Sequence, residues 1–86
     1  MAVAIAVRVR LFARLREQAG FEAERIEVAQ GSTLADVYAT LRRTYPSLEP
    51  DRNAVRGALN QEFSDWDAIV AQGDEVAFIP PVSGGR

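Results

Sequence analysis

Three side chains that carry much of enzyme and metal chemistry are missing from this chain of 86 residues, which has no lysine, no histidine and no cysteine. Without cysteine and histidine, the chain cannot form a Cys/His zinc site, a disulfide framework, a cysteine nucleophile or a Ser-His-Asp relay. An iron–sulfur cluster with four cysteine ligands is excluded as well. Most self-contained enzyme chemistries are therefore excluded, and only carboxylate-based sites stay open.

The charged residues do not indicate a nucleic-acid site. Twelve acidic residues and ten arginines leave a net charge of −2, and the sequence pI is about 5.0, whereas binding to a phosphate backbone needs a positive field. The local cluster of Arg8, Arg10, Arg14 and Arg16 has acidic neighbours and predicts a solvated strand and helix face. The acidic residues are scattered singly, so we expect surface charges, with no metal site and no nucleic-acid partner.

Long hydrophobic runs are also absent. The longest one, residues 1–7, is far shorter than the ~20 residues that span a bilayer, and no basic residue precedes it. We therefore expect a cytoplasmic protein without a membrane partner. A chain of this length forms one domain and buries only ~60–65% of the surface that its unfolded state exposes.

Alternating apolar residues predict a long, half-buried strand over residues 3–12, with Arg8, Arg10 and Phe12 on its second face. Residues 13–19 are rich in helix formers and are followed by Gly20, which predicts a short helix with a left-handed cap. Residues 24–29 place Ile26 and Val28 two apart, so we expect a second strand there beside the first.

The strongest helix signal begins at Thr33, which forms an approximate capping box with Asp36. The apolar residues that follow at helical spacing are Leu34, Val37, Tyr38, Leu41 and Tyr45. Pro46 ends this helix. Strands are expected near residues 54–59 and 62–63, on either side of a turn at residues 60–61, and over residues 75–79. Between them, residues 64–72 predict an irregular or short helical segment with core contacts from Trp66, Ile69 and Val70.

This order of elements predicts an α+β fold in which one main helix lies across a mixed sheet of four or five strands. If the first and last strands lie side by side and parallel in the middle of the sheet, the fold is the ubiquitin-like β-grasp. We expect a domain over residues 1–79 and an extended, flexible C-terminal tail over residues 80–86.

The tail is the unusual part of the sequence. Pro80 and Pro81 have no backbone N–H to donate to a sheet, so they end the last strand. Gly84 and Gly85 have no side chains, so the backbone at these residues can approach a reactive centre closely. Six extended residues reach at most ~20 Å, at ~3.3 Å each, which is enough to deliver a terminal carboxylate into a partner's active site. The alternative is an ordinary frayed terminus.

Three segments, residues 73–85, 58–61 and 11–17, resemble the MoaD family of ubiquitin-like sulfur carriers, the small subunits of molybdopterin synthase. The resemblance implies a non-catalytic sulfur-donor subunit with no stably bound cofactor. An activating enzyme of the ubiquitin-activating type (MoeB-like) would use ATP and magnesium to adenylate the terminal glycine, which a sulfur donor converts to a thiocarboxylate. The large synthase subunit (MoaE-like), in a heterotetramer, would then receive the tail, and the sulfur would attack a cyclic pterin precursor in molybdenum cofactor biosynthesis.

The resemblance also implies roles for residues at the end of the chain. Gly85 would carry the sulfur and Gly84 would give slim access to the partner. A docking surface is expected from Phe78, Ile79, Pro80, Pro81, Val82 and Ser83. Because Phe78 shares its predicted face with Val76, the alternative is that Phe78 belongs to the core.

Arg86 departs from the family pattern, in which the chain ends at the second glycine. Three explanations are open: a protease trims Arg86, the residue is an artefact of the gene assignment, or the protein is not a carrier. We favour the first two because the preceding motif is complete. Two alternatives to the molybdopterin function stay open. The first is a ThiS-like carrier for cysteine, thiamine or another thio-metabolite, and the second is a ubiquitin-like protein modifier.

Overall fold

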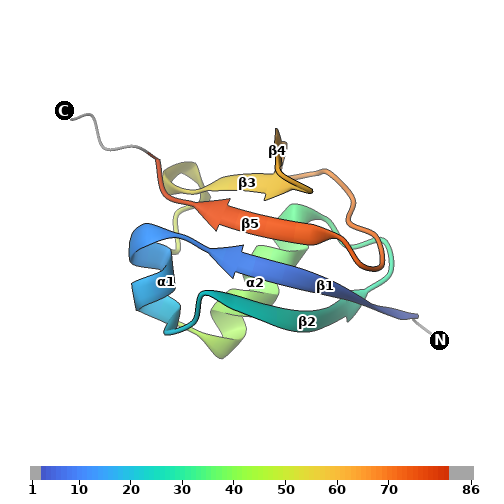
Figure 1. Cartoon of the computed structure of the whole chain (residues 1–86), viewed down its shortest axis with the longest axis horizontal. Coiled ribbons are helices and arrows are strands. Elements are labelled where there is room, and N and C mark those ends of the chain that lie inside the picture. Colours follow the sequence, from blue (N-terminus) through green and yellow to red (C-terminus); the bar gives the residue numbers. More distant parts are fainter. Residues whose placement is uncertain (1–2, 82–86) are drawn as a thin grey trace.

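The computed structural model describes residues 3–81 and contains one mixed sheet of five strands in the order β2-β1-β5-β3-β4 (Figure 1). The elements in chain order are β1 (Ala4–Leu11), α1 (Ala13–Ala19), β2 (Ala23–Ala29), α2 (Leu34–Thr44), the 3-10 helix η1 (Arg52–Ala54), β3 (Arg56–Leu59), β4 (Glu62–Ser64) and β5 (Glu75–Ile79). No helix in this part of the chain is long and apolar enough to cross a membrane.

The first and last strands are parallel neighbours at the centre of the sheet. The β1–β5 register runs from Arg8 opposite Glu75 to Leu11 opposite Phe78. β2 pairs with β1 in an antiparallel manner, as β3 does with β5 on the other side. This is the arrangement on which the β-grasp prediction depended, and it is confirmed.

One face of the sheet forms the core because the strands are amphipathic. On β1 the side chains of Ile5, Val7, Val9 and Leu11 are buried, as the alternating pattern predicts. α2 crosses this face behind the sheet in the view of Figure 1. Its buried side is made of Leu34, Val37, Tyr38 and Leu41, four of the five residues that the helical spacing selected. The fifth, Tyr45, follows the helix as its C-cap. We call this the inner face of the sheet, and the side away from α2 the outer face.

The start of α2 has the predicted capping box. The Asp36 backbone N–H donates to Thr33 Oγ1 at 3.2 Å, and the Thr33 N–H donates to Asp36 Oδ2 at 3.0 Å. These bonds satisfy N–H groups that a helix start leaves without intrahelical partners. At the other short helix, Gly20 adopts φ 86° and donates to the Arg16 carbonyl at 2.8 Å, so the predicted left-handed cap of α1 is confirmed as well.

Two sequence predictions differ from the structure. The strand expected from residue 54 begins at Arg56, because Asp51 accepts the Asn53 N–H at 2.9 Å and caps η1 there. Ile69 was expected in the core and is 64% exposed. Ile69 pairs with Thr33 in an antiparallel bridge. Successive side chains of such an extended segment point to opposite sides, so Val70, which is 2% exposed, enters the core in place of Ile69.

Candidate functional site

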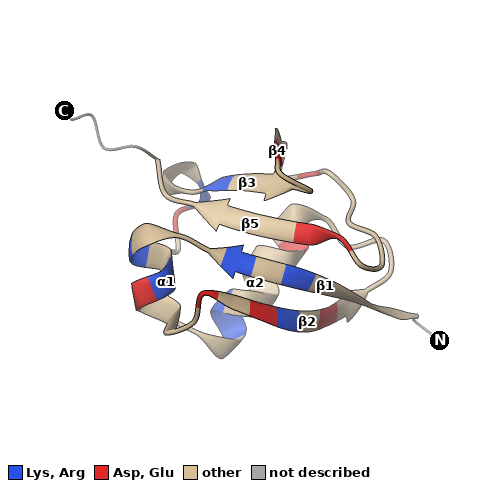
Figure 2. Ribbon diagram, in the orientation of Figure 1, with Lys and Arg blue, Asp and Glu red and all other residues tan. Residues whose placement is uncertain are grey.

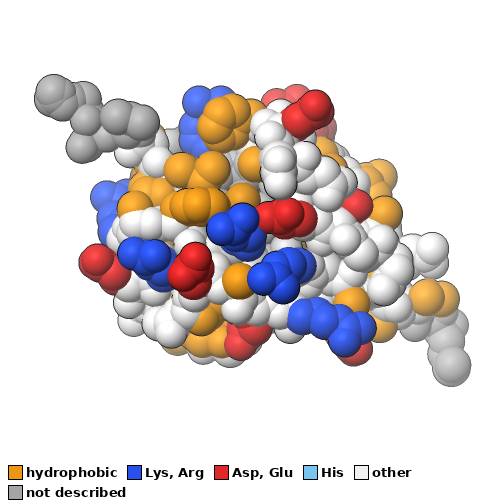
Figure 3. All heavy atoms as spheres, viewed as in Figure 1, with side chains coloured by type: hydrophobic (Ala, Val, Ile, Leu, Met, Phe, Trp, Pro, Cys, Tyr) orange, Lys and Arg blue, Asp and Glu red, His pale blue; other side chains and the backbone are white. Residues whose placement is uncertain are grey.

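The outer face of the sheet has two halves of different character. Charged residues gather on β1 and β2, whereas β5 beyond Glu75 carries none (Figure 2). In the space-filling view of the same face, apolar side chains gather over β5, β3 and β4 (Figure 3). A face that no helix covers would be expected to be polar along most of its length. The apolar half is therefore the candidate site.

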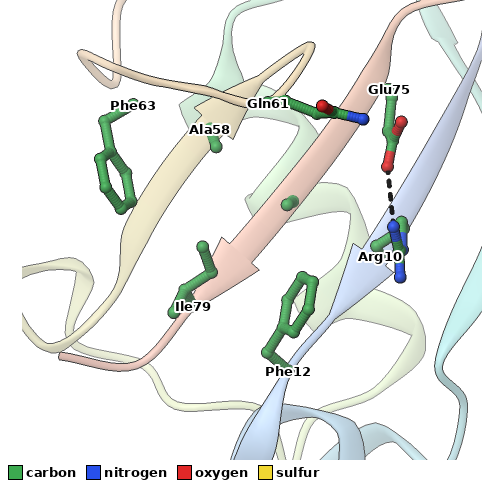
Figure 4. Close-up of a pocket in the computed structure, with 8 residues that line it drawn as sticks. Arg10, Phe12, Ala58, Gln61, Phe63, Glu75 and Ile79 are labelled. Carbon is green, nitrogen blue, oxygen red and sulfur yellow. Dashed lines mark hydrogen bonds and ion pairs between the residues drawn. The ribbon is translucent and has the colours of Figure 1, made fainter. Parts of the chain in front are cut away.

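A groove of about 180 Å³ lies in this apolar half. We call it the outer-face groove, and its lining residues are Arg10, Phe12, Ala58, Gln61, Phe63, Glu75, Ala77 and Ile79 (Figure 4). Its apolar lining residues come from β3, β4, β5 and the junction between β1 and α1, and they outnumber the polar ones.

The strand register explains why this part of the sheet is hollow. Arg10, Ala77, Ala58 and Phe63 are successive partners across β1, β5, β3 and β4. The two central residues of this row are alanines, which rise only one carbon above the backbone, while larger side chains stand at both ends. The alanines therefore form the floor of the groove, and the larger side chains form its rim.

Two aromatic rings on the rim are unusually exposed for their size, with 38% of Phe12 and 61% of Phe63 accessible to solvent. The Arg10 guanidinium lies 5.3 Å from the centre of the Phe12 ring, and the Arg56 guanidinium lies 4.3 Å from that of Phe63. Stacked cations hold an aromatic ring in place while leaving the other side of the ring open. Both rings are thus available to a partner.

An ion pair closes the charged side of the groove. Arg10 Nη1 lies 3.2 Å from Glu75 Oε2, and both side chains are partly buried (Figure 4). Mutual neutralisation of these two charges leaves the groove with an apolar floor and no net charge at this edge. Such a surface suits an apolar protein segment better than a charged ligand.

The structure divides the predicted docking residues into three groups. Ile79 is half-buried and lines the groove, and its contact with a partner stays a prediction. Pro80 is half-buried and directly follows Ile79, but it is not among the residues that line the groove. Pro81 is exposed and lines a different hollow, together with Arg56 and Trp66. Val82, Ser83, Gly84, Gly85 and Arg86 lie outside the described residues.

The prediction that Phe78 lines the docking surface is wrong. Its side chain is 0% exposed and packs on the inner face, with ring centres 4.9 Å from Tyr38 and 5.8 Å from Trp66. The alternation along β5 places Val76 and Phe78 on the inner face, and Ala77 and Ile79 on the outer face. The alternative reading of Phe78 as a core residue is confirmed.

Sequence reasoning missed Phe12 and Phe63 as site residues. A usable signal existed for Phe12, because the strand pattern placed this large aromatic residue on the polar face beside Arg8 and Arg10. Phe63 follows the turn at Asn60 and Gln61, both of which have positive φ angles. Its place beside Ala58 depends on the register of the β3–β4 hairpin, which the sequence alone does not give.

The titratable groups form no catalytic constellation in the described residues. Within residues 3–81, no group of three or more Asp, Glu, His or Cys side chains is placed to hold a metal ion. Burial, and then the nearby Glu49 carboxylate, raises the pKa of Tyr38 to about 12, but its hydroxyl donates to the Glu49 carbonyl at 2.7 Å and serves the core. A hydrogen bond to Glu24 raises the pKa of Tyr45, the residue that follows α2 as its C-cap.

A mixed sheet with parallel central strands and a helix across one face defines the chain as a ubiquitin-like β-grasp protein. The chain belongs to the ThiS family, whose model matches residues 9–85.

Individual relatives support both statements. The molybdopterin synthase sulfur carrier subunit of Arabidopsis thaliana is 42% identical over 81 residues, which cover 94% of this chain and 84% of the relative. The crystal structure of SAMP1 from Haloferax volcanii, a small archaeal modifier protein, superposes with a TM-score of 0.81 at 32% identity, covering 93% of this chain and 99% of that one. A third match is to a complex of subunits 1 and 2 of the molybdopterin-converting factor from Helicobacter pylori, with a TM-score of 0.65 at 26% identity, covering 94% and 100%.

Proposed function

We propose that this protein is the sulfur carrier subunit of molybdopterin synthase and that its reactive group is the main-chain carboxylate of Gly85. The observation that carries the proposal is the family match, which continues past β5 and past the described residues to residue 85. A match that ended with the sheet would support only the fold. The name of the Arabidopsis relative supports the choice of pathway.

The chemistry fits a chain without lysine, histidine or cysteine. A carboxylate is a poor electrophile, so an activating enzyme would use ATP and magnesium to convert Gly85 to an acyl-adenylate with release of pyrophosphate. A sulfur donor then displaces AMP, and the carbon–sulfur bond of a thiocarboxylate replaces the carbon–oxygen bond. This soft nucleophile attacks the cyclic pterin precursor, and hydrolysis returns the carboxylate. Every side chain that these steps need belongs to a partner. A cytoplasmic location, where ATP is available, is part of the proposal.

The outer-face groove is the proposed docking surface for the large synthase subunit. Ile79, the last residue of β5, lines it, so a partner that covers the groove also meets the end of the strand from which the tail continues. The exposed rings of Phe12 and Phe63 supply apolar contact area at the positions where aromatic side chains usually anchor an interface. The Helicobacter pylori match supports a partner of this kind, because its title describes a complex of two subunits.

Arg86 has to leave before Gly85 can be activated. Adenylation acts on a terminal carboxylate, which in the sequence as written belongs to Arg86. We therefore include a processing protease among the partners. Gly84, without a side chain, leaves the backbone slim where it enters the partner's active site.

The likeness to SAMP1 favours a second candidate, a protein modifier in which Gly85 is joined to amino groups of other proteins. A reconstituted reaction separates the two. The chain ending at Gly85 is incubated with the activating enzyme, ATP, magnesium and a sulfur donor, and then with the large subunit and the pterin precursor. A carrier yields dithiolene product in proportion to the thiocarboxylate consumed, and the chain ending at Arg86 yields none. If the Gly85 chain acquires no sulfur, or appears only as adducts on other proteins, the carrier function is refuted. A carrier for another thio-metabolite would acquire sulfur but give no pterin product.

A further inference from the structure

The outer edge of β2 has a charge pattern that complements itself. β2 is an edge strand, and in the part of the chain that the structure describes no strand pairs with its free side. Its sequence, AERIEVA, has Arg25 and Glu27 on either side of the central Ile26. The alternating colours along β2 in Figure 2 show this arrangement.

The hydrogen-bonding groups that β2 presents to solvent follow from its pairing with β1. The Gln30 N–H donates to the Val3 carbonyl, and the Leu11 N–H donates to the Glu22 carbonyl. In an antiparallel ladder, alternate residues bond to the same neighbour, so even-numbered residues of β2 face β1. The N–H and C=O groups of Arg25 and Glu27 therefore point outward from the sheet.

A second β2 strand can pair antiparallel with this edge in only a few registers. The residues whose N–H and C=O groups point outward must lie opposite one another in the two copies. The twofold axis that relates the copies then passes through one residue of the strand. An axis at Arg25 would place Arg25 against itself, and an axis at Glu27 would place Glu27 against itself. An axis at Ile26 places Arg25 of each copy opposite Glu27 of the other, and Ile26 opposite Ile26 on the inner face.

Arg25 and Glu27 also lack opposite charges across the strand within their own chain. On the outer face, the cross-strand neighbour of Arg25 is Arg8, and that of Glu27 is Ala6. Like charges directly opposite one another are destabilising. The ion pairs found within residues 3–81 join Arg10 to Glu75, Arg14 to Glu49 and Arg16 to Glu22, and none includes Arg25 or Glu27.

We propose that the β2 edge binds a second copy of this chain, in an antiparallel pair with its twofold axis at Ile26. Two five-stranded sheets become continuous through this pair, and Arg25 gains Glu27 of the other copy as its partner. The outer-face groove is built by β1, β5, β3 and β4, so the dimer leaves it open. The proposal is independent of the sulfur-carrier function.

Analytical ultracentrifugation of the full chain over a wide concentration range tests the dimer. The average mass is expected to rise from 9.4 kDa toward twice that value. Glu27→Arg places like charges opposite one another at both ends of the pair and is expected to weaken the dimer about tenfold. The double exchange Arg25→Glu with Glu27→Arg recreates both opposite-charge pairs and is expected to restore it. Amide exchange gives a local readout, because the Arg25 and Glu27 amides should become protected at high concentration.

The matched control is Glu62→Arg, which changes net charge equally on the edge strand at the other side of the sheet. Circular dichroism confirms that each variant is folded. The proposal is overturned if the wild-type chain stays at 9.4 kDa at all concentrations. It is also overturned if Glu27→Arg dimerises as the wild type does, if Glu62→Arg weakens the dimer equally, or if the double exchange does not restore it.

Discussion

Replacing Phe63 with alanine tests whether the outer-face groove is the docking surface. An aromatic side chain carries roughly 150–250 Å² of surface, and 61% of Phe63 is exposed. A partner that covers this exposed part therefore removes roughly 120 Å² from water, worth up to about 3 kcal/mol at ~25 cal/mol per Å². The dissociation constant of the complex with the large subunit is then expected to rise by as much as about a hundredfold.

Isothermal titration calorimetry with the purified large subunit measures this change. Ile69→Ala is the matched control, because Ile69 is 64% exposed but is not among the residues that line the groove. Both substitutions are at exposed positions, so urea unfolding should show small changes in stability, with the lost Arg56–Phe63 stacking as the larger of the two. Unchanged affinity in Phe63→Ala, or an equal loss in Ile69→Ala, would refute the placement of the docking surface.

Three further predictions follow from the same structure. Phe78→Ala should cost about 3–5 kcal/mol in urea unfolding because it leaves a cavity in the core; lost binding at unchanged stability would contradict its burial. The free energy of unfolding should fall as pH rises from 10.0 to about 12, since the unfolded chain releases the Tyr38 proton more readily than the folded one, and Tyr38→Phe should lose this part of the pH dependence. Deletion of Gly85 and Arg86 should leave the melting temperature unchanged and abolish sulfur transfer; a large loss of stability would show a structural role for these residues.

The elements with strong local signals were predictable from the sequence. The alternation along β1, the capping box at Thr33 and the Gly20 cap each depend on interactions within a few residues, and the structure has all three. Pro80 similarly marked the end of β5. Local chemistry of this kind determines where an element begins and ends.

The candidate site was harder to predict because it depends on contacts between distant segments. Ala58, Phe63 and Ala77 share a row only through the registers of β3 with β4 and with β5. The sequence pattern allowed Phe78 to lie either in the core or on the surface. The alternation of side chains along β5 places it in the core. Ile69 was misassigned for a similar reason, since its pairing with Thr33 selects Val70 for the core.

The mass of the mature C-terminus in the organism that makes this protein tests the central claim most directly. Intact-mass analysis, with fragmentation to locate any change, should find a population that ends at Gly85 and carries one sulfur in place of a carboxylate oxygen. Cells in which the activating enzyme is deleted should contain the Gly85 carboxylate only. A chain that always retains Arg86, or one whose Gly85 never carries sulfur when the activating enzyme is present, would contradict the account.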